Sequence, residues 1–335
     1  MKKINRTFPS TRLRRTRMQK FSRNLTSENL LTSNDLIWPV FIMDGQNKKK
    51  EIKSMPLIYR YSIDNIIPEI DRLVKIGLQA IALFPYIENN KKDQTGSLAL
   101  DSDNLVCRCV KEIKKYFPEL GIICDVALDP YTSHGHDGII HNDKVNNDKT
   151  ISILKKQALV QAEAGCDILA PSDMMDGRVS SIRKTLESNG FKDTLIMSYS
   201  AKYASCFYGP FRDAIQSSKL LKPINKKSYQ MNPANSNEAL YEVSMDISEG
   251  ADMIIIKPGL PYLDIISKCK EEFKIPIFAY QVSGEYSMIM SVAKMGFLNL
   301  EDAILESLIC FKRAGSDGIF SYFAPHVLEK MNKSR

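Results

Sequence analysis

The sequence predicts an α/β fold, a (β/α)8 TIM barrel with an extended N-terminal arm, from three observations. Eight short apolar runs, each stopped by Gly, Pro or a polar residue, recur along the chain. Helical patterns separate most of them, and the runs are continuously apolar, as expected of parallel strands covered on both faces. Strand and helix alternating in this way are typical of the barrel. The predicted strands are residues 36–42, 80–84, 122–127, 167–170, 195–199, 253–256, 277–282 and 318–323.

The helical patterns carry apolar residues on one face and end at a glycine. Examples are Ile66, Ile70, Leu73 and Val74 before Gly77, and Ala239, Val243 and Ile247 before Gly250. An open, doubly wound sheet of similar content remains an alternative. The sequence contains neither a Gly-rich dinucleotide turn nor a Walker loop, and this weakens that alternative.

Length and composition indicate an ordinary globular chain. Its 335 residues, 44% hydrophobic and 25% charged, fit two domains or one barrel with long loops, and they exclude disorder and low-complexity arrays. No apolar run approaches the roughly 20 residues that span a bilayer. Seven scattered cysteines fit a reducing compartment. We therefore expect a soluble cytoplasmic protein without a membrane partner.

Residues 1–34 form a predicted basic arm, distinct from a catalytic barrel at 35–335. The formal charge is +7, yet residues 1–27 contain nine Lys or Arg and no acid, so the rest of the chain is close to neutral. Such an arm could contact nucleic acid, direct transit, dock on an acidic neighbouring subunit or stay solvated. Its composition alone leaves these alternatives open.

Two connections are much longer than usual, at about residues 128–150 after the third strand and 200–235 after the fifth. Long insertions without structure in a compact fold are usually lids or binding loops. In a barrel both would emerge at the C-terminal face, where active sites lie.

Lys257 ends the apolar run 252–257 (DMIIIK) and should lie at the barrel rim. Burial there would lower its pKa and leave more neutral amine, which attacks carbonyls. A rim lysine that pairs with a carboxylate or holds a phosphate is the alternative. Lys202, in 197–206 (MSYSAKYASC), follows the fifth strand at the same face. Repulsion between two ammonium groups would lower at least one pKa further, and two amines suggest two carbonyl substrates.

Other candidates flank the lysines. Arg212 and Lys226 lie in the same long loop and could hold a substrate carboxylate, or be solvated loop charges. The third strand ends in Asp125, followed by Asp129, His134, His136 and Asp137, which suggest a metal site or a general-base cluster. Asp125 is the better placed base. Cys107 and Cys109 fall in a helical pattern and predict packed or exposed thiols rather than zinc.

Several strings in order closely resemble the porphobilinogen synthase, or 5-aminolevulinate dehydratase, family. They are the strings around Lys202 and Lys257 together with 228–233 (SYQMNP), 280–286 (YQVSGEY) and 320–323 (FSYF). The resemblance runs from about Arg12 to Ala324. It implies a (β/α)8 lyase that condenses two 5-aminolevulinate molecules into porphobilinogen, in tetrapyrrole and heme biosynthesis. A class I aldolase-type enzyme that uses Lys257 alone is the alternative.

The resemblance implies a role for each matching residue. Lys257 would form the Schiff base with the propionate-side substrate and Lys202 that with the acetate-side substrate. Arg212 and Lys226 would hold the acetate-side carboxylate, and Ser283 and Tyr322 the propionate-side one. The substrate-binding set includes Gln230, and Asp125 is the expected base. Lys226 stands where many relatives carry Arg, so bidentate geometry is lost there.

The resemblance also implies the metals. Zinc-using relatives carry three Cys at the positions of Ala127, Asp129 and Asp137, and carboxylates favour harder cations such as magnesium. The chain thus resembles an aspartate-rich branch without catalytic zinc. Glu242 matches the position that such relatives use for a remote, allosteric magnesium.

The family's arm embraces a neighbouring subunit and helps to build a homo-octamer. The resemblance therefore favours subunit docking over nucleic acid or transit for residues 1–34. Arg12, Arg14 and Arg15 are expected to meet acids across the interface, with residues 173–176 as one candidate stretch.

Overall fold

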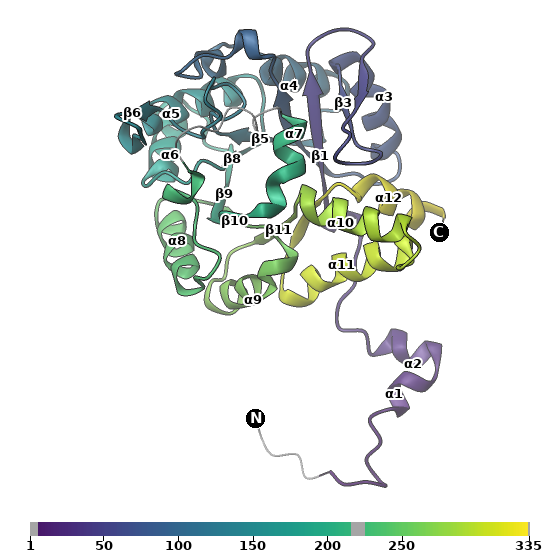
Figure 1. The fold of residues 1–335 in the computed structure, drawn as a ribbon. Coiled ribbons are helices and arrows are strands. Elements are labelled where there is room, and N and C mark those ends of the chain that lie inside the picture. The colour runs from purple at the N-terminus through teal and green to yellow at the C-terminus, as the bar shows by residue number, and fades with distance from the viewer. Residues whose placement is uncertain (1–5, 216–224, 334–335) are drawn as a thin grey trace.

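The computed structural model describes residues 6–215 and 225–333 (Figure 1). Eight parallel strands each pair with the next, and the last pairs with the first through Leu36 and Ile319. This closure confirms the predicted barrel and excludes the open sheet. The barrel strands are β1 (Leu36–Met43), β4 (Ala80–Tyr86), β5 (Gly121–Val126), β8 (Ile168–Pro171), β9 (Leu195–Lys202), β10 (Met253–Lys257), β11 (Ile277–Gln281) and β12 (Gly318–Ser321).

Helices surround the strands and bury the faces that the periodicity predicted (Figure 1). Ile66, Ile70 and Leu73 are fully buried, as are Ala239 and Val243. Every residue of β1 is buried, which explains the continuous apolar run. The outer helices are α3 (Ile63–Val74), α4 (Leu105–Tyr116), α5 (Asn147–Glu163), α6 (Arg178–Ser188), α8 (Asn237–Ser248), α9 (Leu263–Glu272), α10 (Ser283–Lys294), α11 (Leu300–Ala314) and α12 (Ala324–Lys333).

The two long connections are more regular than predicted. The first contains a hairpin, β6 (Ile140–His141) with β7 (Lys144–Val145), before α5 begins. The second contains the short helices η4 (Cys206–Tyr208), α7 (Gly209–Ala214) and η5 (Lys226–Ser228), and its residues 216–224 lie outside the described residues. The prediction of structureless loops was wrong. Pro210 in the first turn of α7 favours the start of a helix.

A further hairpin, β2 (Lys49–Glu51) with β3 (Tyr59–Tyr61), extends the sheet beside β1. The arm carries α1 (Arg15–Met18) and α2 (Lys20–Leu25) and lies outside the ring of helices (Figure 1). Its apolar side chains are exposed, with Leu13 at 71% and Leu25 at 81%. No helix in the described part of the chain has the length and apolar character needed to cross a membrane.

Candidate active site

Lys202 and Lys257 are the last residues of the neighbouring strands β9 and β10 and pair directly with each other. The strands start in a register that pairs Ile254 with Ser198, which would place Lys257 opposite Ala201. A register shift between Ile254 and Ile256 adds one residue to β9 and brings Lys202 opposite Lys257 instead. Since side chains alternate between the faces of a strand, this bulge puts both amines on the same side of the sheet.

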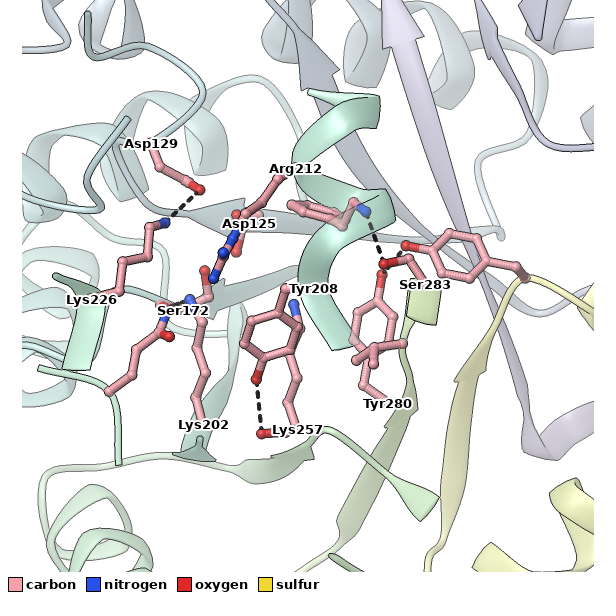
Figure 2. Close-up of a pocket in the computed structure, with 14 residues that line it drawn as sticks. Asp125, Asp129, Ser172, Lys202, Tyr208, Arg212, Lys226, Lys257, Tyr280 and Ser283 are labelled. Carbon is pink, nitrogen blue, oxygen red and sulfur yellow. Dashed lines mark hydrogen bonds and ion pairs between the residues drawn. The ribbon is translucent and has the colours of Figure 1, made fainter. Parts of the chain in front are cut away.

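Both lysines line one cavity at the carboxyl ends of the strands (Figure 2). The cavity gathers nearly every residue predicted for the site, namely Asp125, Asp129, Lys202, Arg212, Lys226, Gln230, Lys257, Ser283 and Tyr322. Asp137 contacts two of these residues, whereas Glu242 lies on a different cavity. The predicted convergence of two lysines in one pocket is therefore present in the structure.

Lys257 lies in an aromatic environment. Its Nζ lies 4.5 Å from the ring centre of Tyr280 and 4.8 Å from that of Tyr199. Burial, reinforced by the charge of nearby Lys202, lowers the pKa of Lys257 to about 7. A substantial fraction of this amine is therefore neutral and nucleophilic at neutral pH.

Lys202 lies in a polar environment instead. Its Nζ donates to Oδ1 of Asp137 at 3.1 Å and to the backbone carbonyl of Ser172. Asp137 in turn lies 2.7 Å from Lys226 Nζ and accepts a hydrogen bond of 2.7 Å from the Tyr229 hydroxyl. Although burial opposes it, the two lysines and these hydrogen bonds hold the pKa of Asp137 well below its usual range.

Lys226 has two carboxylate partners, because Asp129 Oδ2 also lies 3.2 Å from its Nζ. Burial opposes the charge of Lys226, but Asp129 and Asp137 raise its pKa. Asp129 and Asp137, at the positions where the resemblance implies cysteines in zinc-using relatives, therefore pair with lysines in this chain. Lys226 forms ion pairs with both carboxylates, so an anion that binds Lys226 shares it with them.

Asp125 lines the same cavity, and the charges of both lysines act on its carboxyl group. Burial and the neighbouring charge of Asp129 raise the pKa of Asp125 to about 6, while Lys202 opposes that rise. Its Oδ1 has no hydrogen-bond partner among the described residues. A carboxyl group with a pKa close to neutrality can accept and return a proton.

The opposite wall of the cavity holds the predicted Ser283 and Tyr322. Ser283 Oγ accepts a 2.9 Å hydrogen bond from the backbone N–H of Phe211. The hydroxyls of Tyr322 and Tyr280 lie 3.1 Å apart. Gln230 is buried, and its Oε1 has no partner within the described residues. These hydroxyl and amide groups can receive a polar ligand, as can Arg212 on the α7 side of the cavity.

Comparisons with known proteins match this chain over nearly its full length. Residues 10–330 fit the family model of delta-aminolevulinic acid dehydratase. A delta-aminolevulinic acid dehydratase of Bradyrhizobium diazoefficiens is 56% identical over 96% of this chain and 90% of its own length. One of Methanothermus sociabilis is 50% identical over 97% of this chain and 99% of its own length.

The chain belongs to the delta-aminolevulinic acid dehydratase family.

A solved structure supports the same conclusion at the level of the fold. The delta-aminolevulinic acid dehydratase (porphobilinogen synthase) of Toxoplasma gondii ME49, in complex with the reaction product porphobilinogen, superimposes with a TM-score of 0.95. The two chains are 43% identical, and the match covers 97% of this chain and 92% of the other. The resemblance that the motifs indicated is therefore confirmed.

Sequence reasoning about this dehydratase fold missed five residues that line the cavity, namely Ser172, Tyr208, Phe211, Tyr280 and Val282. Tyr208 and Phe211 lie just before Arg212, and Tyr280 and Val282 lie in the string 280–286, so the three aromatic residues were an available signal. Ser172 had no such signal, although its backbone carbonyl accepts from Lys202 and its side chain hydrogen-bonds to Asp125.

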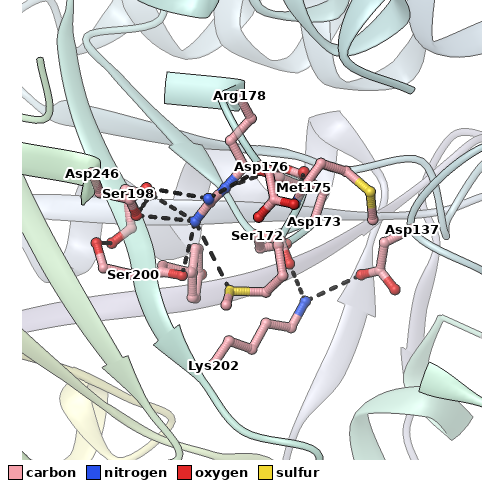
Figure 3. A network of polar contacts seen from close by, with 12 residues as sticks. Asp137, Ser172, Asp173, Met175, Asp176, Arg178, Ser198, Ser200, Lys202 and Asp246 are labelled. Atoms are coloured by element: carbon pink, nitrogen blue, oxygen red, sulfur yellow. Dashed lines mark hydrogen bonds and ion pairs between the residues drawn. The ribbon is translucent and has the colours of Figure 1, made fainter. Parts of the chain in front are cut away.

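A buried network lies behind Ser172 (Figure 3). Arg178 donates to both carboxylate oxygens of Asp246, at 3.2 and 3.0 Å, and to the carbonyl of Met175 at 3.2 Å. It thereby ties α6, α8 and the loop after β8 together. Asp173 also pairs with Arg178 and is 0% exposed, so within the stretch 173–176 this acid is not accessible to an arm from another subunit. Asp176 in the same stretch is exposed.

The His-x-His pair contacts neighbouring protein groups, and the Cys-x-Cys pair is buried. His136 is fully buried with Nδ1 3.1 Å from the Tyr229 hydroxyl, and burial lowers its pKa to about 4. His134 Nε2 lies 3.1 Å from the Gln94 carbonyl. Cys107 and Cys109 are buried free thiols, as the helical pattern predicted.

Glu242 lies half-buried on α8, on a surface cavity shared with Asp143, Asp176 and Glu238. Burial raises the pKa of Glu242 to about 7, with Arg178 opposing the rise and Asp246 adding to it. A carboxylate that is disfavoured as an anion, among further acids, fits a hard cation such as magnesium. The residues described contain no group of three metal-ligating side chains close enough to hold a metal by themselves.

Proposed function

We propose that this chain is a porphobilinogen synthase, a hydro-lyase that condenses two molecules of 5-aminolevulinate into porphobilinogen in heme biosynthesis. The observation that carries the proposal is the pairing of Lys202 with Lys257 at the mouth of one cavity. Two amines in one pocket can each capture a ketone, and holding both substrates together converts their condensation into an intramolecular reaction. Membership of the family supports the same activity.

Each lysine would capture one substrate. The neutral amine of Lys257 attacks the ketone of the molecule that supplies the propionate arm, and Lys202 attacks that of the molecule that supplies the acetate arm. Lys202 would attack through its Nζ, which donates a hydrogen bond to Asp137. Asp125, with its pKa raised to about 6, is the proposed base for the amine or carbon proton that leaves during ring formation.

The polar groups on the two walls would hold the substrate carboxylates. Arg212 and Lys226 bind the acetate-side carboxylate, with Gln230 beside them, and Ser283 and Tyr322 bind the propionate-side carboxylate. The position of all five on the cavity supports these roles. Lys226 offers a point charge rather than a planar fork, and it is already shared by Asp129 and Asp137.

The alternative is an aldolase-type reaction on Lys257 alone. It leaves the buried ammonium of Lys202 and its contact with Asp137 without a role. The pairing of the two lysines therefore favours the two-Schiff-base reaction.

Magnesium is the proposed metal, bound remotely through Glu242, where it would act as an allosteric activator. The acids on the same cavity support a cation there. We propose no catalytic zinc, because Ala127 offers no ligand and Asp129 and Asp137 are engaged by lysines. Their carboxylates cannot reproduce the soft thiolate set that zinc favours.

We further propose that the enzyme is a cytoplasmic homo-octamer whose arm, residues 1–34, docks on a neighbouring subunit. Exposed Phe8, Leu13 and Phe21 on the arm would be buried there, and neither nucleic acid nor a membrane is needed as a partner. All seven cysteines are free thiols, which fits the reducing cytoplasm.

The test is porphobilinogen formation by the purified protein with and without magnesium. We expect turnover that falls when magnesium is removed and persists when trace zinc is chelated. Borohydride reduction in the presence of substrate should attach adducts at Lys257 and Lys202, with exposed Lys227 as the unmodified control. Labelling of Lys257 alone with a sugar phosphate, without porphobilinogen, would support the aldolase instead.

A further inference from the structure

Four aromatic rings surround the amine of Lys257. Its Nζ lies over the ring faces of Tyr280, Tyr199, Phe211 and Tyr208, at 4.5, 4.8, 5.2 and 5.6 Å from their centres. The rings come from β9, β11 and the connection after β9, so three separate segments converge on one nitrogen. The three tyrosines are buried, with at most 5% of each exposed.

The amine of Lys257 differs from that of Lys202 in its contacts. No residue within 6–215 or 225–333 forms a hydrogen bond or an ion pair with its Nζ, whereas Lys202 has Asp137 and the Ser172 carbonyl. The π faces are therefore the main groups in contact with any positive charge at Nζ of Lys257. Cations placed over aromatic faces within about 6 Å are attracted by the ring quadrupole.

Such an environment treats two kinds of cation differently. A lysine ammonium is a compact and strongly hydrated charge, so its transfer into an apolar cage carries a large desolvation penalty. A protonated Schiff base spreads its charge over nitrogen and carbon and carries one N–H, so it loses less hydration. Aromatic cages favour weakly hydrated organic cations for the same reason.

We propose that Tyr199, Tyr208, Phe211 and Tyr280 form a cation–π cage that stabilises the cationic Schiff base on Lys257 in preference to the free ammonium. In this step the Nζ lone pair attacks the ketone carbon and the C=N bond forms. The ketone oxygen leaves as water, with one proton from Nζ and one from an acid. The inference rests on the proposed function, because it concerns the same Schiff base.

The cage accounts for two requirements that a simple apolar pocket meets only in part. The lysine must be neutral to attack, and its pKa is lowered to about 7 chiefly by burial. The product of the attack is nevertheless a cation at the same nitrogen. Rings provide burial before the reaction and a negative face after it, which is a difference in binding between ground state and intermediate.

Phe211 allows the test because its ring has no hydroxyl. It would be replaced by mono-, di- and trifluorophenylalanine, which keep the shape of the ring while weakening its quadrupole. The probe is 4-oxopentanoic acid, which has the substrate's ketone and carboxylate but lacks the amine needed to proceed. The measurement is the dissociation constant of the adduct at Lys257, from the fraction trapped by borohydride at each probe concentration.

We expect each fluorine to raise the dissociation constant of the adduct by about 1.5- to 2-fold. Phe211→Leu removes the ring and should raise this constant above that of the trifluoro variant. Phe207 is the matched control, because it is also partly buried on the same connection but its ring is not among those over Nζ. The same fluorination there should leave adduct formation unchanged. A flat series at Phe211, or an equal trend at Phe207, overturns the cage.

The two proposals fail in different ways. If the wild-type protein makes porphobilinogen while the fluorinated series is flat, the cage is wrong and the proposed function stands. If the adduct forms at Lys257 and weakens along the series but no porphobilinogen appears, the cage stands and the proposed function is wrong. Absence of any adduct overturns both.

Discussion

The two lysines of the pocket are neighbours, but the groups that surround their amines differ. Lys202 is held by a carboxylate and a carbonyl, while Lys257, its direct partner across β9 and β10, faces rings. The environment of Lys257 lowers its pKa to about 7. The environment of Lys202 instead includes the carboxylate of Asp137. One fold thus surrounds one amine with aromatic rings and places the other against a carboxylate and a carbonyl.

The largest effect should come from removing either amine. Lys257→Ala and Lys202→Ala should each lower porphobilinogen formation by at least about 10³-fold, because each removes one covalent attachment. Circular dichroism should show an intact fold, and Lys227→Ala is the matched control on an exposed lysine. Turnover that survives Lys202→Ala would end the two-Schiff-base mechanism and favour chemistry on Lys257 alone.

The next effect tests the polar half of the comparison. Asp137→Asn keeps the shape of the side chain but removes the carboxylate shared by Lys202 and Lys226. Leaving buried ammonium groups without their anion should cost about 3–5 kcal/mol of unfolding free energy. Asp129→Asn should cost less, because among the described residues the ion pair of Asp129 is with Lys226 and none is with Lys202. Urea denaturation of both variants measures the difference, and equal losses would contradict the shared role of Asp137.

A pH dependence tests the aromatic half. Reactivity of Lys257 toward an amine-directed reagent should rise through a midpoint near pH 7, since the pKa of Lys257 is lowered from 10.5 to about 7. Mass spectrometry of labelled peptides can follow Lys257 and an exposed lysine in one sample. A midpoint near that of the exposed lysine would refute the effect of burial.

The same shift predicts the sign of a stability effect. The unfolded chain keeps this proton up to about pH 10.5 and the folded chain only up to about pH 7. Burial of Lys257 therefore lowers the free energy of unfolding, and the full penalty applies below pH 7. The penalty becomes smaller as the pH rises from 7 toward 10.5. Lys257→Met should stabilise the fold more at pH 6 than at pH 9, as measured by the free energy of unfolding.

The smallest effect concerns Lys226. Lys226→Arg restores a planar fork for a carboxylate and should lower KM by about 2- to 5-fold with little change in kcat. Initial rates over a range of 5-aminolevulinate concentrations give both constants. A higher KM would mean that the fit of Lys226 between Asp129 and Asp137 matters more than its geometry toward substrate.

The strands, the lysines and their common cavity could be predicted because they depend on local patterns. Apolar runs predicted the strands, and two lysines at strand ends of one barrel face had to lie near each other. The contacts could not be predicted in the same way. Asp137 pairs with Lys202 and Lys226, which are 65 and 89 positions away in the sequence. The contact of Lys202 with Ser172 uses a backbone carbonyl, which is the same for every residue type.

Burial explains the remaining errors. Asp173 looks like a surface acid in the sequence, but it is enclosed with Arg178 beneath the loop after β8. The predicted fifth strand included Ser198 but ended three residues early, at 199, because the polar Ser200 interrupts the apolar pattern of a strand that continues to Lys202. Both serines are fully buried, and their hydroxyls have hydrogen-bond partners.

The register shift between β9 and β10 has a consequence for protein engineering. If β9 kept all its residues but ran on in the register in which it starts, Ala201 would pair with Lys257 and the Lys202 side chain would turn to the opposite face of the sheet, with every catalytic side chain still encoded. The spacing of this segment is thus as strict a requirement as the identity of either amine. Anyone grafting the pair onto another scaffold must graft the irregular spacing along with it.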